Sequence, residues 1–238
     1  MLFRSPHYML MRRAQIIESI TINDLELNIT SQDEAFAPVT SSQHTLATYK
    51  NPFGFSLQVV QSGENITLSY SGSDVATLNL PVDDAVGGVS TGNVADLELS
   101  FVDQRLTSIN NGAFASFFAA VTDTSSVTFG LKGTANVVAK TTIGDVPISG
   151  IPFDVQSTLK GINKLGGTAQ LSNVTVVGSG GDGGNQFIKS PLTTKLQNPS
   201  NISLQTNDIA LPVFYKGIQL GRASIDVSIV VCLYAAIF

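Results

Sequence analysis

Apolar and polar residues alternate along most of this chain, and the alternation predicts β-strands with one buried face and one face in water. The clearest runs are residues 25–30, 95–101 and 127–137, where the apolar side chains fall on one face. Turn signals separate the runs, as at Gly87-Gly88 and Gly144-Asp145. The pattern predicts a mainly β fold whose strands pack as a β-sandwich.

One segment departs from this period of two. Between residues 110 and 121, four apolar side chains fall at helical spacing, namely Phe114, Phe117, Phe118 and Val121. Asn110 or Asn111 is a suitable N-cap for a helix that begins there. We therefore expect one short helix that closes an end or an edge of the sandwich. Its apolar residues pack into the core in the simpler interpretation and contact an apolar ligand in the alternative one.

A second pattern is a repeat. Each copy begins with Asn-Pro, continues into a strand ending Ser-Leu-Gln and an Ile-x-Leu strand, and closes with a Tyr-x-Gly turn. The residues that define the two copies are Asn51, Pro52, Tyr70 and Gly72, and then Asn198, Pro199, Tyr215 and Gly217. The two asparagines lie 147 residues apart, whereas solenoid repeats recur about every 20–50 residues. The repeat therefore indicates a duplicated β-domain.

The repeated residues have architectural roles. Proline fixes φ and lacks an N–H donor, so it suits the first residue or the edge of a strand. The asparagine before it is pushed toward extended geometry, and its side chain can satisfy a turn. The glycine supplies the positive φ of a hairpin turn.

The two copies differ in length. The first predicts a complete domain over residues 15–160, and the second predicts a partial copy over residues 168–230, because nothing remains to match the helix and last strands of the first. A half-sandwich leaves an apolar face and an open strand edge, which folded proteins avoid. Two outcomes stay open: the chain is a fragment of a longer protein, or the partial unit packs on the first one.

The composition of the chain excludes several classes of partner and of metal site. The net charge is −5, and only 13 residues are Lys or Arg. Nucleic-acid binding needs clustered basic side chains, so nucleic acid is not an expected partner. Cys232 is the only cysteine, which excludes an intrachain disulfide and metal centres built from several cysteines.

Three motifs look chemical but lack the context that the chemistry needs. Residues 178–183 match Gly-x-Gly-x-x-Gly, but a proline-containing segment follows where a nucleotide site needs a helix. Residues 88–92 match Gly-x-Ser-x-Gly, but no histidine follows His44. Asp83-Asp84 lacks the spacing of a calcium loop. A carboxylate pair for glycoside hydrolysis stays open, although no tryptophan is present to stack on a sugar. We expect no catalytic residues, no cofactor and no metal.

Four Asn-x-Ser/Thr sequons make Asn28, Asn65, Asn173 and Asn201 candidate glycosylation sites. Four of them in a chain of low charge favour a secretory or vacuolar lumen. The start of the chain lacks the continuous apolar segment of a signal peptide. The apolar run over residues 227–238 is shorter than the roughly 20 residues that span a bilayer, and is expected to be a buried strand.

The ordered set of motifs resembles the late-embryogenesis-abundant group-2 (WHy-type) domain. The resemblance rests on Tyr49 to Phe55, Ile66 to Gly72 and Val75 to Leu78, and again on the second Asn-Pro copy. It is strongest to a fungal branch in which such domains occur in tandem behind a membrane anchor. It implies an immunoglobulin-like β-sandwich with one helix, no catalytic residues, no cofactor, and a groove that holds lipid. This sequence departs from the anchored pattern because it contains no transmembrane helix.

Three functions are expected from this resemblance. The first is a non-enzymatic module on the extracytoplasmic side of a membrane or in the vacuolar lumen, binding a lipid acyl chain between the sheets or beneath the helix at residues 114–121. The second is a structural or interaction module that pairs with another protein through an exposed strand edge. The third is stress protection, by analogy with the plant members. A groove lined by Leu, Ile and Phe favours the first, and a filled core with an open edge at residues 209–231 favours the second.

Overall fold

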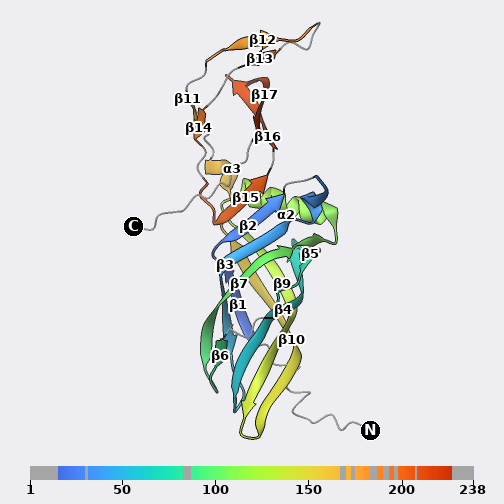
Figure 1. Ribbon diagram of the computed structural model, residues 1–238, viewed down its shortest axis with the longest axis vertical. Helices are drawn as coiled ribbons and strands as arrows, with labels where there is room; N and C mark the ends of the chain where they lie inside the picture. Colours follow the sequence, from blue (N-terminus) through green and yellow to red (C-terminus); the bar gives the residue numbers. More distant parts are fainter. Residues whose placement is uncertain are drawn as a thin grey trace.

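The computed structural model confirms that the chain is mainly β, with one α-helix of substantial length (Figure 1). Two sheets pack face to face around one apolar core, so the main body is a β-sandwich. The structure describes residues 16–29, 32–82, 87–166, 170–172, 175–182, 187–189, 193–195, 198–206 and 208–226.

The first sheet is organised around one long strand. Its members are β1 (Ile17–Ile22), β2 (Leu25–Ile29), β3 (Val39–Lys50), β7 (Val94–Arg105) and β15 (Ile202–Thr206). β1 and β2 follow each other along one edge of β3, both antiparallel to it, and β7 pairs antiparallel with the other edge. β15 then adds to β2 in parallel, as the outermost strand.

The second sheet contains the longest strands. Its members are β4 (Ser56–Tyr70), β5 (Ser73–Leu78), β6 (Gly87–Val89), β8 (Thr107–Ser108), β9 (Val127–Thr141) and β10 (Gly144–Leu159). The order is β10-β9-β4-β5-β8, with β6 beside β4. The pairing of β4 with β9 slips at three points between Val59 and Thr67, and such bulges bend a strand and increase its twist.

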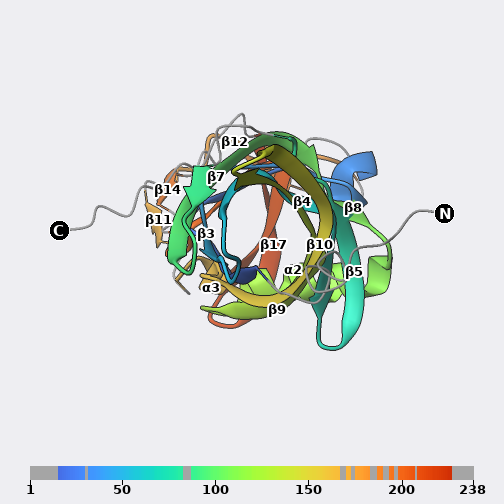
Figure 2. The same ribbon diagram turned by 90° about the horizontal axis from the view of Figure 1, so that it is seen from below.

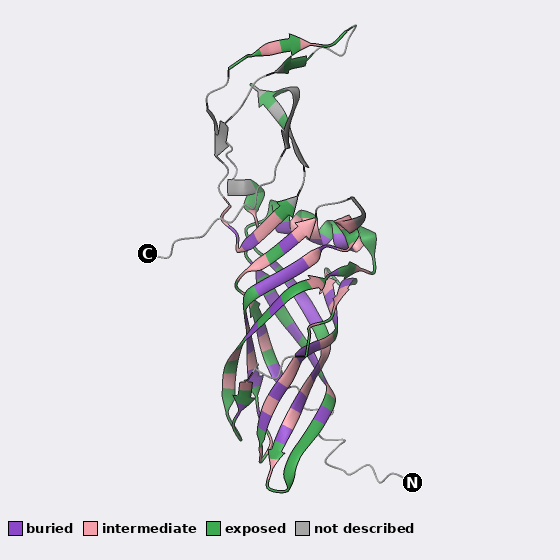
Figure 3. Cartoon of the chain, viewed as in Figure 1, coloured by how far each residue is buried: buried purple, intermediate pink, exposed green. Residues whose placement is uncertain are grey.

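The core lies between the two sheets, which surround it when the molecule is viewed along its long axis (Figure 2). Buried and exposed positions alternate along the strands, as the bands in Figure 3 show. In β10, for example, Phe153, Val155, Ser157 and Leu159 are buried, whereas the residues that alternate with them are exposed to solvent. The sequence predicted this period of two residues between buried positions.

The predicted helix is α2 (Asn111–Asp123). Its N-cap is Asn110, whose Oδ1 accepts a hydrogen bond from the backbone N–H of Ala113 at 3.1 Å. The helix lies at one end of the sandwich (Figure 1) and buries Phe114, Phe117 and Val121. It therefore closes an end of the sandwich, as its spacing predicted.

Shorter elements complete the described chain. They are η1 (Gln32–Phe36), α3 (Asn163–Gly166), β11 (Gln170–Ser172), β12 (Gly178–Gly180), β13 (Phe187–Lys189), β14 (Thr193–Lys195), β16 (Asp208–Tyr215) and β17 (Ile218–Asp226). The strands among them form three separate two-stranded ladders: β11 with β14, β12 with β13, and β16 with β17. Within the described residues, none of these ladders joins either sheet of the sandwich.

The second Asn-Pro copy is therefore divided between the two parts of the molecule. Its first strand, β15, joins the first sheet, where Ile202 is buried in the common core. Its Tyr-x-Gly hairpin, β16–β17, lies outside the sandwich. The strand that follows the second Asn-Pro motif thus packs in the sandwich beside β2. Cys232 and the rest of residues 227–238 lie outside the described residues.

Candidate functional site

A cavity of about 80 Å³ lies between the two sheets, next to α2. Its walls are apolar side chains from both sheets and from the helix. The first sheet provides Ile20, Leu27, Leu99 and Phe101, and the second provides Ile66, Leu68, Phe129 and Leu131. Phe117, Phe118 and Val121 of α2 and Ile202 of β15 complete this part of the lining.

The strands direct these side chains inward because of their period of two. Phe129 and Leu131 are two residues apart on β9, and Leu99 and Phe101 are two residues apart on β7, so each pair shares a face. The alternation in the sequence predicts these common faces for the same reason. It did not predict that the faces leave space between them, because volume depends on the fit of many side chains.

The helix contributes an aromatic cluster to the wall. The Phe117 ring lies with its centroid 5.5 Å from Phe118 and 5.6 Å from both Phe129 and Tyr70. Phe114 packs against Phe118 at 4.6 Å and against Phe36 at 6.0 Å. Of the four residues that the sequence singled out on this helix, Phe117, Phe118 and Val121 line the cavity, whereas Phe114 lies in the core beside it.

The cavity is not fully sealed. Five of its apolar lining residues keep partial exposure to solvent, namely Ile22, Leu25, Leu78, Leu80 and Phe118. They come from the first sheet, from β5 and the residues after it, and from α2. An apolar group can therefore approach the cavity between elements that are already partly open to solvent.

The lining contains no charged side chain among the described residues, and its polar residues are Thr40, Thr45 and Ser62. Thr45 shares a hydrogen bond of 2.8 Å with Ser42. Ser62 lies beside the buried phenol of Tyr49. Burial raises the pKa of Tyr49 to about 12, and the Ser62 hydroxyl offsets part of that rise. A site with this lining suits hydrocarbon, because an ionised group placed there would lose its hydration without gaining a partner.

In both Asn-Pro motifs the asparagine side chain forms hydrogen bonds with nearby backbone groups. Asn51 is fully buried, and its Nδ2 donates to the carbonyl oxygens of Phe55 (2.8 Å) and Val89 (3.0 Å). Its Oδ1 accepts from the N–H of Phe53 at 3.0 Å. Asn198 Nδ2 donates to the carbonyl oxygen of Ile202 at 2.7 Å, and its Oδ1 accepts from the N–H of Ser200 at 3.0 Å.

The two Tyr-x-Gly turns also match. After Tyr70, Ser71 and Gly72 have φ of 49° and 79°, and after Tyr215, Lys216 and Gly217 have φ of 49° and 81°. Two central residues with positive φ define the type I′ turn that suits a tight hairpin. Both turns connect antiparallel strands, β4 to β5 and β16 to β17.

The sequons occupy different surroundings. Asn65 is exposed on an irregular part of β4, and Asn28 lies partly buried in β2. Asn201 lies partly buried just before β15 and donates from Nδ2 to the carbonyl oxygen of Ile22 at 2.7 Å. Asn173 lies outside the described residues.

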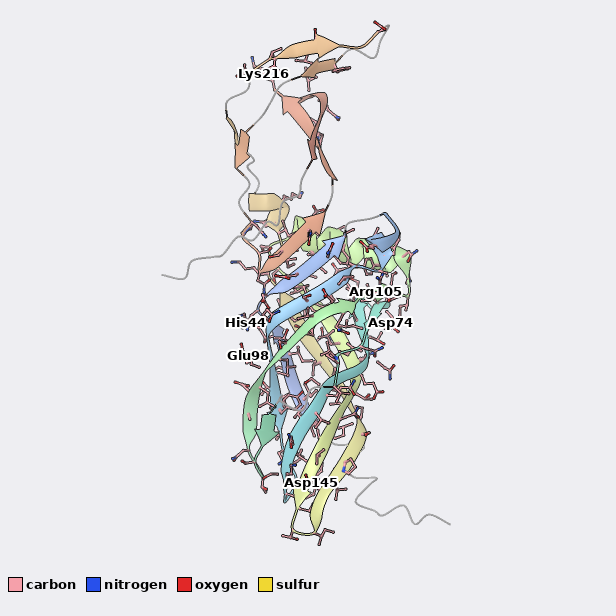
Figure 4. All side chains as sticks on the ribbon, viewed as in Figure 1. His44, Asp74, Glu98, Arg105, Asp145 and Lys216 are labelled. Atoms are coloured by element: carbon pink, nitrogen blue, oxygen red, sulfur yellow. The ribbon has the colours of Figure 1, made fainter. Side chains whose placement is uncertain are left out.

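One pair of polar side chains, His44 and Glu98, was not predicted to be in contact. His44 Nδ1 lies 2.7 Å from Glu98 Oε1, on the surface of the first sheet (Figure 4). The hydrogen bond that His44 donates to the Glu98 carboxylate raises the pKa of His44, although both side chains are about two-thirds exposed. The only sequence signal was that both residues lie on the wet faces of their strands, which does not reveal that the strands are neighbours.

The described residues contain neither a cluster of metal ligands nor a membrane-spanning helix. No group of three or more His, Cys, Asp or Glu side chains there could hold a metal ion. None of the helices in that part of the chain combines the length and the apolar character needed to cross a membrane.

Comparison with known proteins identifies the family. The chain belongs to the DUF3712 family of proteins of unknown function, whose model matches residues 70–213, more than half of the 238 residues. The match runs from the end of β4 to β16 and so crosses both predicted copies. No curated protein matches the chain. A crystal structure of a protein from Archaeoglobus fulgidus aligns with 60% of this chain and 96% of its own, at 16% identity and a TM-score of 0.25, which is too low to support an argument.

Proposed function

We propose that this member of the DUF3712 family is a non-enzymatic binding module that holds a hydrocarbon segment of a lipid in the cavity between its sheets. The observation that carries the proposal is the lining: apolar side chains from both sheets and from α2, with no charge among the described residues. Binding pockets for small molecules are mostly apolar with few polar groups, and this one is at the apolar extreme.

The size of the cavity limits what enters it. Its volume of about 80 Å³ is roughly half that of an engineered apolar cavity of about 150 Å³ that takes up benzene. The resting cavity therefore accommodates the end of one acyl chain and not a whole lipid. The head group and the rest of the chain stay outside, along the partly exposed residues Leu78, Leu80 and Phe118.

Burial supplies the driving force for such binding. Each methylene group that leaves water contributes about 0.8 kcal/mol. A few methylenes give modest affinity, which suits a protein that contacts the lipid of a membrane or passes a lipid on. We propose a lumenal or vacuolar setting, on the extracytoplasmic side of a membrane, which the four sequons support.

The matching geometry of the two Asn-Pro motifs supports the proposed kinship with late-embryogenesis-abundant group-2 domains. Asn51 and Asn198 make equivalent hydrogen bonds, and both Tyr-x-Gly turns are type I′. These are the residues on which the resemblance rests, and a common local structure is what a duplication would produce.

A second candidate function is pairing with another protein through a strand edge. The β16–β17 hairpin favours it, because Phe214 and Ile218 are 58% and 68% exposed and the hairpin joins neither sheet among the described residues. An isolated two-stranded hairpin is marginally stable in water, so a strand added along it would stabilise it.

Native mass spectrometry tests the proposed binding. The protein is produced in a yeast secretory pathway, its glycans are removed enzymatically, and the mass is read before and after delipidation. The proposal predicts adducts in the mass range of lipids that disappear on delipidation. A bare monomer before delipidation contradicts lipid binding, and a bare oligomer favours pairing through β16–β17.

A further inference from the structure

The sequons at Asn65 and Asn201 are closely matched in sequence but not in structure. Each asparagine is followed by an isoleucine and then by a hydroxyl residue, Thr67 or Ser203. Each isoleucine is buried, with 5% exposure for Ile66 and 2% for Ile202. Apart from the hydroxyl residue, the two sites therefore differ in the surroundings of the asparagine and in what its side chain contacts.

Asn65 faces solvent. Its φ is +51°, in the left-handed region that asparagine tolerates better than most residues. The pairing of β4 with β9 shifts register between Glu64 and Thr67, so Asn65 stands at an irregular point of the ladder. Its backbone N–H donates to the Oδ1 of Asn79 at 2.7 Å, which fixes the main chain while the side chain stays exposed.

Asn201 instead belongs to the contact that holds β15 in the sheet. Its Nδ2 donates to the carbonyl oxygen of Ile22 at 2.7 Å, and its own carbonyl accepts from the N–H of Leu25 at 2.9 Å. Its Oδ1 is buried and has no partner among the described residues. A glycan would be attached at Nδ2, the same atom that contacts Ile22, and would have to fit between β15 and the residues that link β1 to β2.

We infer that Asn65 is an N-glycosylation site of the folded protein and that Asn201 is not. The occurrence of this modification in the cell rests on the lumenal setting proposed above. The structural part of the inference is independent of lipid binding: a glycan at Asn65 projects into solvent, and a glycan at Asn201 is incompatible with the docked β15.

The test uses the full chain behind a secretory leader in yeast, so that the leader imposes the compartment. Secreted, monomeric protein is treated with endoglycosidase H, digested, and read by peptide mass spectrometry at the two sequons. The expected result is a residual sugar on Asn65 and an unmodified Asn201. An unmodified Asn65, or a sugar on Asn201 in folded monomer, overturns the inference.

Ser203→Thr and Thr67→Ser each give the two sequons the same hydroxyl residue, and Thr67→Ala is the negative control. Ser203→Thr makes the second sequon identical in type to the first, and Asn201 is still expected to be bare in the folded fraction. Thr67→Ala removes the first sequon and should abolish the modification of Asn65, whereas Thr67→Ser should keep it. Because lipid adducts are read separately on deglycosylated protein, failure here and failure of the proposed function are distinguishable.

Discussion

Asn51 and Asn198 make the same pair of hydrogen bonds at the same sequence offsets, although they lie 147 residues apart. Each donates from Nδ2 to the carbonyl four residues ahead, at 2.8 and 2.7 Å, and each accepts at Oδ1 from the N–H two residues ahead, at 3.0 Å. Their surroundings differ, because Asn51 is completely buried and also donates to Val89.

This difference predicts unequal effects of mutation. Asn51→Ala removes three hydrogen bonds made by a fully buried side chain, so we expect it to lower the free energy of unfolding by about 3 kcal/mol. Asn198→Ala removes three hydrogen bonds at a partly buried site, where water replaces part of what is lost, and we expect a loss of about 1 kcal/mol. Urea denaturation of the two variants measures the difference. Equal losses, or a larger loss for Asn198→Ala, would contradict the account of the first motif.

Gly161 is predicted to be irreplaceable for a steric reason. A Cβ at this position would lie against the carbonyl oxygens of Thr124 and Val121, at the C-terminal end of α2. Gly161→Ala should therefore destabilise the protein by about 3 kcal/mol or more, because backbone on both sides would have to move. Gly54→Ala is the matched control: nothing lies within 4 Å of its Cβ, and its free energy of unfolding should change by about 0.5 kcal/mol or less.

The position of β15 predicts that part of the second copy stabilises the first. Ile202 is 2% exposed and packs in the common core, whereas Ile218 on β17 is 68% exposed. Ile202→Ala should cost about 3 kcal/mol, and Ile218→Ala should leave the unfolding transition of the sandwich almost unchanged. Thermal or denaturant unfolding followed by circular dichroism compares them. A small effect of Ile202→Ala would mean that β15 does not dock as described.

The His44–Glu98 pair predicts a small dependence of stability on pH. The hydrogen bond donated by His44 to the Glu98 carboxylate raises the pKa of His44 above its ordinary value of 6.5. A raised pKa means that the contribution is fully present below 6.5 and is lost as pH rises through the pKa of the folded state. Glu98→Gln should lower the pKa of His44 in an NMR titration, with His44→Gln used to assign the signal. An unchanged titration in Glu98→Gln would show that the pair does not form in solution.

The fold was more predictable than the site. Alternation is a local property, so the faces that carry Leu99, Phe101, Phe129 and Leu131 could be predicted without knowing their neighbours. The spacing of the phenylalanines predicted α2 for the same reason. The parallel docking of β15 on β2 could not be predicted, because pairing between strands more than 170 residues apart leaves no periodic signal in either. The proximity of His44 and Glu98 could not be predicted either, because the two residues lie 54 positions apart in the sequence.

The cavity itself is the least predictable feature, since it is the space left after side chains from both sheets and from α2 have packed. The helical spacing of Phe114, Phe117, Phe118 and Val121 predicted that they pack in the core or contact an apolar ligand. The spacing gave no volume, and the volume is what limits the proposed ligand to the end of one chain.

The binding of hydrocarbon in this cavity is tested most directly by methyl NMR titration with straight-chain alcohols of increasing length. The account predicts shifts at lining residues such as Leu131, with a dissociation constant that falls about fourfold for each added methylene and levels off when the cavity is full. Val121→Phe, which fills the cavity, should abolish these shifts, and Val102→Phe, at a position that is 54% exposed on β7, should not. Absence of shifts at lining residues for every alcohol, or equal shifts in Val121→Phe, would contradict the central claim.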